Sequence, residues 1–594
     1  MKNIKNLLFF IQHINKAVPY YFLINIVINI IASLPFVLNL LFIKFIMDSF
    51  SEDVSISYCI VIAIIYCVTI TIISCLSNWH RSSYIIVKQV IIQRYFHSLL
   101  FDKLYDIDIY CYENTEFYDK YIKAINEIDK RTSELTNLLS ETVKAISSII
   151  FTSAMVFYLS PIFILFTLFA IINSVYTITK QNKLFLEKYN NTILDIRKQN
   201  YIKNLFYMNQ YIKEIKIFNC ISFFKLKYES STTNYLECIK GYCKKIFNVS
   251  SICCINEYII NFFVLFILIV QIFDGDLGVS DFVTLLNSVM GLTLNAVNLF
   301  NTIPQLNINS KYIENLINIF NFKSYIREGT AKPQKPKDSH IPQILMEKVC
   351  FAYPSNLKID ILKNINLKIY YGQKVAIVGS NGSGKSTLLK LLVKLYNTTD
   401  GEIKYYNKSY SKCSTDYIQS KVSVIFQDFQ SYAFTIAENI LMREIKNQND
   451  VNNIYDALKF CGLFDKVVKL KNGINTVLTK EFDGNGVFFS QGELQKLSIA
   501  RAYIKQNTEV IFMDEVTSAL DTIAETDLFT KIIEQTEKTI IFITHNMNLT
   551  VKADRIIVLD KGEIVEEGNH IKLMQKKGIY TRMFNAQLKC GYSD

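Results

Sequence analysis

Long apolar runs alternate with polar segments through the first half of the chain, and short apolar runs alternate with amphipathic stretches through the second half. A helix needs about 20 mainly apolar residues to cross a bilayer. The pattern predicts a membrane domain of six transmembrane helices, at Phe22–Ile43, Tyr58–Ser77, Thr142–Leu159, Ile162–Ile178, Ile255–Phe273 and Phe282–Ile303. The third of these segments is the weakest, because Lys144 lies near its start.

The charges of the connecting segments predict the orientation of these helices. The connections at Asp48–Asp53 and Asp274–Asp276 are acidic and lack Lys and Arg, and a tight turn at Ser160-Pro161 joins the middle pair. The two long connections, His80–Leu139 and Lys180–Val249, carry many Lys and Arg. Because Lys and Arg favour the cytoplasmic side, we expect the long connections and both termini in the cytoplasm, for a protein of the cytoplasmic (inner) membrane.

Both long connections also have helical periodicity, so we expect the transmembrane helices to continue well beyond the bilayer. The apolar positions that repeat at this spacing are Tyr118, Ile122, Ile125 and Ile128 in the first connection and Tyr211, Ile212, Ile215 and Phe218 in the second.

A second domain of a different class follows a polar stretch with three prolines, Lys332–Pro342, which is typical of a linker. Short β-rich runs such as Lys374–Val378, Val422–Phe426 and Val510–Met513 then alternate with amphipathic helices, which indicates an α/β domain. The predicted divisions are a membrane domain at 1–320, a linker at 321–344 and an α/β domain at 345–594.

Composition narrows the choice of partners. The net charge is +11, but Lys and Arg are spread along the chain and flank apolar runs, which argues against nucleic acid as a partner. The 13 cysteines form no CxxC pair and no His/Cys cluster at metal-binding spacing, so we interpret them as free thiols in a reducing compartment.

The strongest local signal is a glycine-rich segment between a strand and a helix, the context of a phosphate-binding P-loop. Its glycines let backbone N–H groups point at phosphates, and the following helix N-terminus favours negative charge. Lys385 is expected to reach the β- and γ-phosphates of ATP, and Ser386 to bind Mg²⁺. The predicted nucleotide-binding residues of this segment are Gly379, Ser380, Asn381, Gly382, Ser383, Gly384, Lys385, Ser386 and Thr387.

Two further strands end in side chains suited to ATP hydrolysis. The apolar run from Val510 ends in Asp514, expected to hold Mg²⁺, and Glu515, expected to polarise the attacking water. Another apolar run ends at His545, for which we expect contact with the γ-phosphate because the rest of the site is present.

Together these motifs resemble those of ABC exporters of the half-transporter type, in which six transmembrane helices are fused to one ABC ATPase domain. The resemblance implies that Tyr353 stacks on adenine, that Gln427 touches Mg²⁺ and the attacking water, and that Asp521 lies in the D-loop. It also assigns Phe489-Ser490-Gln491-Gly492-Glu493 to the signature segment, which usually reads Leu-Ser-Gly-Gly-Gln.

Gln491 is the notable departure from that segment, because a side chain there restricts the backbone and crowds the phosphate. Either closure is slower or weaker, or the variant is tolerated. Ser490, Gly492 and Glu493 are expected to cap the ATP that is held by the other subunit.

The resemblance implies a dimer that binds two ATP molecules and alternates between inward- and outward-facing cavities. All ATP-site motifs are present in this one chain, which favours a homodimer over pairing with a related half-transporter. Tyr110–Tyr118 and Glu214–Asn219 resemble the two coupling helices of the family, and ordinary amphipathic turns are the alternative.

The predicted cargo is a peptide, because Tyr112–Asp119 and the Glu481–Gly486 run resemble bacterial exporters often associated with peptides. Lipid or drug export and a non-transporting, ATP-gated membrane regulator are the alternatives, whereas an importer would usually need a differently organised membrane domain. The stretch before the first span is too short for the cysteine protease domain of some peptide exporters, so no cleavage of a leader peptide is expected. Glu257 either meets a cationic substrate or lies solvated at the inner interface.

Overall fold

The computed structural model describes residues 2–51, 55–322, 329–336, 338, 340–354, 356–515, 522–534 and 537–591. The chain forms two compact units. One comprises Met1–Tyr105 and Asp119–Phe322, and the other comprises Asp106–Tyr118 and Lys323–Asp594. The short segment Asp106–Tyr118, predicted as part of the membrane domain, therefore belongs to the same compact unit as the carboxy-terminal domain.

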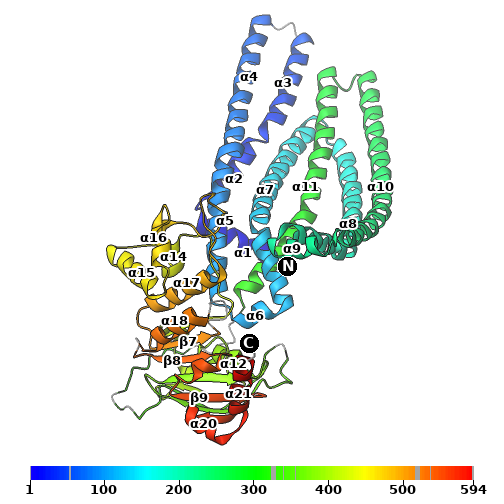
Figure 1. The fold of residues 1–594 in the computed structure, drawn as a ribbon. Helices are drawn as coiled ribbons and strands as arrows, with labels where there is room; N and C mark the ends of the chain where they lie inside the picture. Colours follow the sequence, from blue (N-terminus) through cyan, green and yellow to red (C-terminus); the bar gives the residue numbers. More distant parts are fainter. Residues whose placement is uncertain are drawn as a thin grey trace. The chain divides into compact units, whose positions relative to one another are not determined.

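The first unit is helical, and among its described residues six helical segments are long and apolar enough to cross a membrane (Figure 1). These segments are Tyr21–Phe50, Ile56–Tyr105, Lys120–Leu159, Phe163–Tyr207, Ile221–Phe273 and Val279–Phe320. The helices behind them are α1 (Lys2–Ala17), α2 (Tyr21–Ile31), α3 (Leu34–Ser51), α4 (Ile56–Trp79), α5 (Ile85–Tyr105), α7 (Thr115–Leu159), α8 (Phe163–Tyr207), α9 (Asn209–Ile217), α10 (Ile221–Phe273) and α11 (Val279–Phe320).

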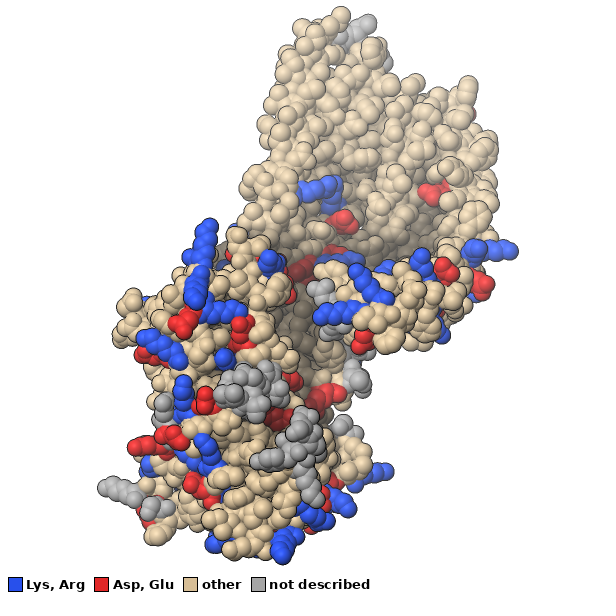
Figure 2. All heavy atoms as spheres, in the orientation of Figure 1, with Lys and Arg blue, Asp and Glu red and all other residues tan. Residues whose placement is uncertain are grey.

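The helices extend far beyond the predicted apolar cores. A π-helical turn, His80–Tyr84, joins α4 to α5 without a break, and α10 runs for 53 residues. Charged side chains are sparse on the visible face of the apolar helices and frequent on their polar extensions (Figure 2). This distribution is the one expected when the apolar cores face lipid and the extensions face water.

The first predicted span is not one helix. Helix α2 ends at Ile31 and α3 begins at Leu34, with a two-residue turn between them. Pro35 explains the break, because it lacks an N–H group and its ring clashes with a preceding helical turn, so it is best tolerated near a helix start. The Ser33 hydroxyl donates to the Ile30 carbonyl over 2.6 Å and satisfies one of the carbonyl groups that the break leaves without a helical partner.

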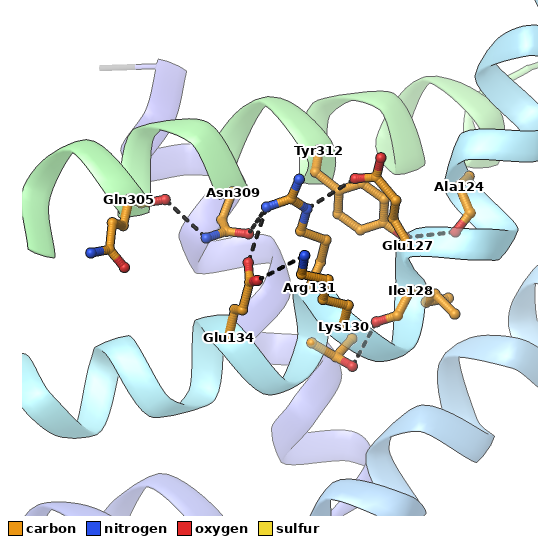
Figure 3. A network of polar contacts seen from close by, with 10 residues as sticks. Ala124, Glu127, Ile128, Lys130, Arg131, Glu134, Gln305, Asn309 and Tyr312 are labelled. Carbon is orange, nitrogen blue, oxygen red and sulfur yellow. Dashed lines mark hydrogen bonds and ion pairs between the residues drawn. The ribbon is translucent and has the colours of Figure 1, made fainter. Parts of the chain in front are cut away.

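A polar network ties the extensions of α7 and α11 together (Figure 3). The Arg131 guanidinium donates to Glu127 over 2.9 Å and to Glu134 over 3.0 Å, and it reaches Asn309 on α11 over 3.4 Å. The buried Tyr312 hydroxyl donates to the Ala124 carbonyl over 2.7 Å. These carboxylates hold the pKa of Arg131 above its usual value, although burial alone would lower it.

The second unit is an α/β domain with two sheets. The larger sheet has the order β10-β9-β3-β8-β7-β6, and all of its neighbouring strands are parallel except β9 and β10. Its strands are β3 (Lys374–Gly379), β6 (Val422–Ile425), β7 (Val510–Asp514), β8 (Thr539–Ile543), β9 (Arg555–Asp560) and β10 (Glu563–Gly568). The smaller, antiparallel sheet has the order β2-β1-β4-β5, from β1 (Ile344–Phe351), β2 (Leu362–Ile369), β4 (Asp400–Tyr405) and β5 (Lys408–Ser409).

Strands β3, β7 and β8 are buried along their whole length, which explains their continuous apolar sequences. Helices cover the larger sheet, so its interior is closed and functional groups gather where the parallel strands end. The helices of this unit include α12 (Lys385–Leu392), α14 (Ile436–Leu441), α15 (Gln448–Phe460), α17 (Gln491–Ile504), α18 (Thr522–Glu534), α20 (His570–Lys576) and α21 (Ile579–Gly591), of which α14 and α15 pack on α17 beside the sheet.

Candidate functional site

The predicted phosphate loop joins β3 to the N-terminus of α12. Gly382 and Gly384 have φ of 79° and 101°, a region that favours glycine. A Cβ atom on Gly379 would lie 2.1 Å from the Leu559 carbonyl oxygen, so no side chain fits there. The glycines are therefore required for the loop to fold tightly between β3 and α12, where backbone N–H groups can surround an anion.

Lys385 is folded back onto this loop. Its ammonium group donates to the carbonyl oxygens of Gly379 and Ser380, both over 3.0 Å. Burial lowers the pKa of Lys385, and the nearby carboxylates of Glu515 and Asp514 oppose that shift. The loop therefore holds a lysine among backbone groups that can face phosphate, with two acids beside it.

Asp514, at the end of β7, is buried, and its Oδ1 atom has no hydrogen-bond partner. Burial raises its pKa, and the Glu515 charge adds to that shift, while the Ser386 hydroxyl and Lys385 oppose it. A buried carboxylate oxygen without a partner, beside a serine hydroxyl, fits a hard cation that prefers oxygen ligands.

The Glu515 carboxylate is held from both sides. Gln427, just beyond β6, donates to its Oε2 over 2.9 Å, and His545, just beyond β8, donates from Nε2 to its Oε1 over 2.7 Å. Since β6, β7 and β8 are neighbours in the sheet, their ends bring these three side chains together. Glu515 also has a left-handed φ of 50°, a conformation that costs a non-glycine residue about 1–3 kcal/mol.

Tyr353 lies beside the first turn of α12. Its hydroxyl is hydrogen-bonded to the Thr387 hydroxyl over 3.0 Å, and its ring packs edge-on against Tyr396, with centroids 5.5 Å apart. The Lys390 ammonium lies 5.6 Å from the Tyr353 ring centroid. The structure thus joins Tyr353 to the P-loop helix.

A short helix from the first half of the chain, α6 (Ile109–Glu113), packs beside this group. Tyr110 packs on the apolar core of the second unit, and Cys111 is buried, which raises its pKa to about 12. Glu113 forms an ion pair with Lys390 at 3.8 Å. The segment predicted as a coupling helix therefore contacts the same helix that follows the phosphate loop.

The signature-like segment begins α17. Ser490 is the N-cap, and its side chain and that of Glu493 form a capping box, with Ser490 N–H donating to Glu493 over 2.9 Å. Lys466 also donates to Glu493 over 2.6 Å. Burial would raise the pKa of Glu493, but these contacts outweigh it and the pKa lies below its usual value. The carboxylate thus has a local role that glutamine would fill less well.

Gln491 is the first residue of α17, and its side chain is exposed. The φ angle of Gln491 is not positive. Glutamine is therefore accommodated without backbone strain at this position, where the usual segment has glycine. Gly492 follows within the same first turn. The hydrogen bonds of Ser490 and Glu493 go to each other and to Lys466, not to the phosphate loop. The predicted D-loop residue Asp521 lies outside the described residues.

Sequence reasoning missed two features around these motifs. The capping box carried a readable signal, since Ser490 and Glu493 have the spacing of that motif. The contact of Glu113 with Lys390 had no such signal, because it joins residues 277 positions apart in the chain through tertiary packing.

Comparisons with known proteins match both halves of this arrangement. Residues 362–518 match the ABC transporter family model. The chain is 27% identical over 474 residues to the subtilin transport ATP-binding protein SpaT of Bacillus subtilis, covering 80% of this chain and 76% of SpaT. It is 29% identical over 378 residues to the nisin transport ATP-binding protein NisT of Lactococcus lactis subsp. lactis, covering 63% and 62%.

Two further similarities concern the ATPase region and the fold. An ATP-dependent lipid A-core flippase of Wigglesworthia glossinidia brevipalpis is 33% identical over 248 residues, covering 41% of each chain. The solved structure of a bacterial Atm1-family ABC exporter with ATP bound superposes with a TM-score of 0.73 at 20% identity, covering 95% of this chain and 97% of that one.

The structure combines six helical segments that are long and apolar enough to cross a membrane with an ABC ATPase domain of an ATP-hydrolysing transporter, in the fold of an ABC exporter. In joining one set of six apolar helices to one ABC domain, it resembles half-transporters of the ABC exporter type and, more particularly, bacterial peptide exporters.

Proposed function

We propose that this protein exports a peptide across the cytoplasmic membrane, as a homodimer that alternates between inward- and outward-facing states. The observation that best supports ATP hydrolysis as the energy source is the Glu515 carboxylate, which is held between Gln427 and His545 beside the phosphate loop. The peptide cargo is supported by similarity to the subtilin and nisin transporters. The acidic external connections and basic cytoplasmic ones support inner-membrane topology with both termini inside.

In the proposed ATP site, the N–H groups of residues 379–387 and the Lys385 ammonium hold the phosphates, and the Tyr353 ring contacts adenine. Ser386, Asp514 and Gln427 would hold Mg²⁺, which when bound neutralises phosphate charge. Glu515 orients a water and accepts its proton, while Gln427 and His545 fix the carboxylate. His545 has a second task, contact with the γ-phosphate.

Dimerisation would complete each site with the second copy's signature segment. Ser490, Gly492 and Glu493 bind the ATP held by the other copy, and Asp521 follows in the D-loop. The support for this assignment is that Ser490 and Glu493 bond to each other and to Lys466, which leaves the start of α17 available to a second molecule.

Coupling between hydrolysis and transport would pass through α6 and α9. The contact of α6 with the helix after the phosphate loop supports the first link. The support for the second is the exposed apolar end of α9, where Ile217 and Phe218 are 78% and 72% exposed. We assign this end to the ABC domain of the second copy, because exposed neighbouring apolar side chains mark an interaction surface.

The test is transport by the purified protein in inside-out proteoliposomes, with fluorescent nisin and subtilin as probes. We expect ATP-dependent uptake that requires Mg²⁺ and is absent in Glu515→Gln. Uptake of a fluorescent lipid or a cationic dye instead of both peptides would contradict peptide export and favour the lipid or drug alternative. ATP hydrolysis without movement of any of these probes would favour the non-transporting regulator.

A further inference from the structure

The membrane unit contains a polar cavity of about 500 Å³ among four of its apolar helices. It lies at the break between α2 and α3, and α4, α7 and α11 supply the other walls. Its position corresponds to the interior of the predicted spans, where lipid-facing positions would be apolar. The polar side chains that line it are Ser33, Asn39, Tyr66, Lys144, Ser148 and Asn295.

The helices present these side chains at helical spacing. Lys144 and Ser148 lie one turn apart on α7, and Tyr66 on α4 donates its hydroxyl to the Asn39 carbonyl over 3.0 Å. That bond occupies the oxygen of the Asn39 amide, so its NH₂ group retains its donors. Hydrogen-bond donors of Asn39 on α3 and of Lys144 and Ser148 on α7 therefore line the same cavity.

Close packing fixes the wall between α3 and α11. Phe36, which also lines the cavity, lies so near Gly291 that a Cβ atom there would be 2.2 Å from its ring. Asn295 follows Gly291 by one turn and lines the cavity on the same side of α11. The absent side chain at position 291 thus sets how closely Phe36 and Asn295 approach.

The charge of this cavity is of one sign. Lys144 is its only charged lining residue, and none of the ion pairs found among the described residues involves it. Lys44, by contrast, pairs with Asp281 between α3 and α11. Glu141, one turn before Lys144, does not line the cavity, whereas Lys144, which is also exposed, does. The N-terminus of α3 beside Ser33 adds a field of the same sign.

A second cavity of the membrane unit also has lysine and asparagine side chains in its lining and no carboxylate. It measures about 420 Å³, lies between α8 and α11, and is mostly apolar. Its polar lining consists of Thr179, Asn182, Lys183, Asn307 and Lys311, without a carboxylate. Glu257 on α10 lines neither cavity. An apolar wall with ammonium and amide groups suits an apolar ligand that carries a negative charge.

We propose that the Lys144 cavity binds a carboxylate group of the exported peptide, either its free C-terminus or an acidic side chain. Lys144 supplies the ion pair, and the amides of Asn39 and Asn295 with the Ser148 hydroxyl supply further donors. An intramembrane lysine without a protein partner is costly unless a ligand or solvated cavity compensates it. This inference rests on the proposed peptide export and names the chemical group that the site selects.

The test uses two N-acetylated, leucine-rich nonapeptides that differ only in a free C-terminal carboxylate or a C-terminal amide. Their affinities are measured for the full-length protein in phosphatidylcholine nanodiscs. We expect the acid to bind about tenfold more tightly than the amide, since a hydrogen bond to a charged group contributes that order of affinity. Lys144→Gln should abolish the difference, and Lys144→Arg should retain it. Lys198→Gln, an exposed lysine on α8 that lines neither cavity, should behave as wild type.

Two results would overturn the assignment. Equal binding of acid and amide to the wild type would show that the cavity does not select a carboxylate. An equal loss of both peptides in Lys144→Gln would show a role in shape instead of charge. In either case nisin would still stimulate ATP hydrolysis if peptide export holds. If neither nonapeptide binds and neither nisin nor subtilin stimulates hydrolysis, peptide export and the cavity assignment both fail.

Discussion

The imidazole of His545 donates its Nε2–H to the Glu515 carboxylate over 2.7 Å, and Gln427 donates to the other oxygen over 2.9 Å. The carboxylate at the end of β7 is therefore oriented by the two strands that flank it in the sheet. A base held in this way needs little reorganisation when it accepts a proton.

Glu515→Gln should lower ATP hydrolysis at least 100-fold, the order expected for removing a general base, while binding of Mg·ATP persists. Hydrolysis is measured by phosphate release and binding by retention of labelled ATP. Glu563→Gln is the matched control, because Glu563 is exposed on β10. Residual activity above one tenth of wild type in Glu515→Gln would point to another base.

Asp514→Asn should stabilise the nucleotide-free protein and abolish hydrolysis. The wild-type carboxylate is buried with an unpartnered oxygen beside Glu515, so neutralising it relieves about 1 kcal/mol, or roughly 2–4 °C in the melting temperature of a unit of this size. The measurement is thermal unfolding in EDTA without nucleotide. A lower melting temperature for the variant would contradict this account.

The raised pKa of Asp514 also gives a pH dependence. The folded state binds this proton more tightly than the unfolded state, so the destabilisation caused by the charged carboxylate fades as pH falls through the folded-state pKa towards the ordinary aspartate value of about 4. The difference in melting temperature between Asp514→Asn and wild type should therefore shrink on acidification. A constant difference from pH 7 down to about pH 4, the ordinary aspartate value, would argue against a raised pKa.

Phe117→Ala should uncouple hydrolysis from transport. Phe117 lies in the first turn of α7, and its backbone N–H donates to the side chain of Asn114, between α6 and α7, over 3.1 Å. We expect ATP hydrolysis within about twofold of wild type, since no catalytic group changes, but fewer peptides moved per ATP. Tyr105→Ala, at an exposed position before α6, serves as the control. Unchanged transport per ATP in Phe117→Ala would exclude this role.

Arg131→Met should destabilise the extension of α7 by about 1–2 kcal/mol, because Glu127 and Glu134 then lose a shared partner and repel each other. Hydrogen exchange of the amides near Ala124 and Asn309 reports the change. The triple variant that also carries Glu127→Gln and Glu134→Gln should recover part of the loss. No recovery would mean that the Arg131 stem contributes by packing, not by charge.

Gly291→Ala should lower the melting temperature of the protein in nanodiscs, by about 1–3 kcal/mol of overpacking against Phe36. Phe36→Leu should rescue it by removing ring atoms from the contact. Gly241→Ala on α10 is the matched control, because no atom lies within 4 Å of an added Cβ there. If Gly241→Ala and Gly291→Ala changed the melting temperature equally, the effect would come from helix propensity and not from contact with Phe36.

Local patterns predicted the features that depend on nearby residues. The strand before Gly379 and the helix after Lys385 lie where the P-loop pattern requires, because the motif itself dictates this turn. Six apolar segments were enough to predict the helical unit. The break before Pro35 had a signal too, but the apolar run on both sides of it concealed the turn.

Tertiary relationships were beyond a single sequence. Nothing near Gly291 shows that its missing side chain accommodates Phe36, and nothing near Glu113 identifies Lys390 as its partner. The meeting of Gln427 and His545 at Glu515 was accessible only through the family resemblance, since it depends on the order of strands in the sheet. Four helices form the walls of the cavity around Lys144, and their packing cannot be predicted from one sequence. In the sequence alone, Lys144 only made the third predicted span less apolar.

The placement of α6 affects how the ATPase half can be studied alone. A polypeptide that starts at residue 323 would lack Tyr110, which packs on the core of that compact unit, and Glu113, which pairs with Lys390. Its aromatic surface around Tyr353 and Tyr396 would be bare and prone to self-association. A synthetic peptide spanning residues 106–118, added in trans, should restore its solubility. The compact ATPase unit is therefore built from two stretches that lie far apart in the sequence.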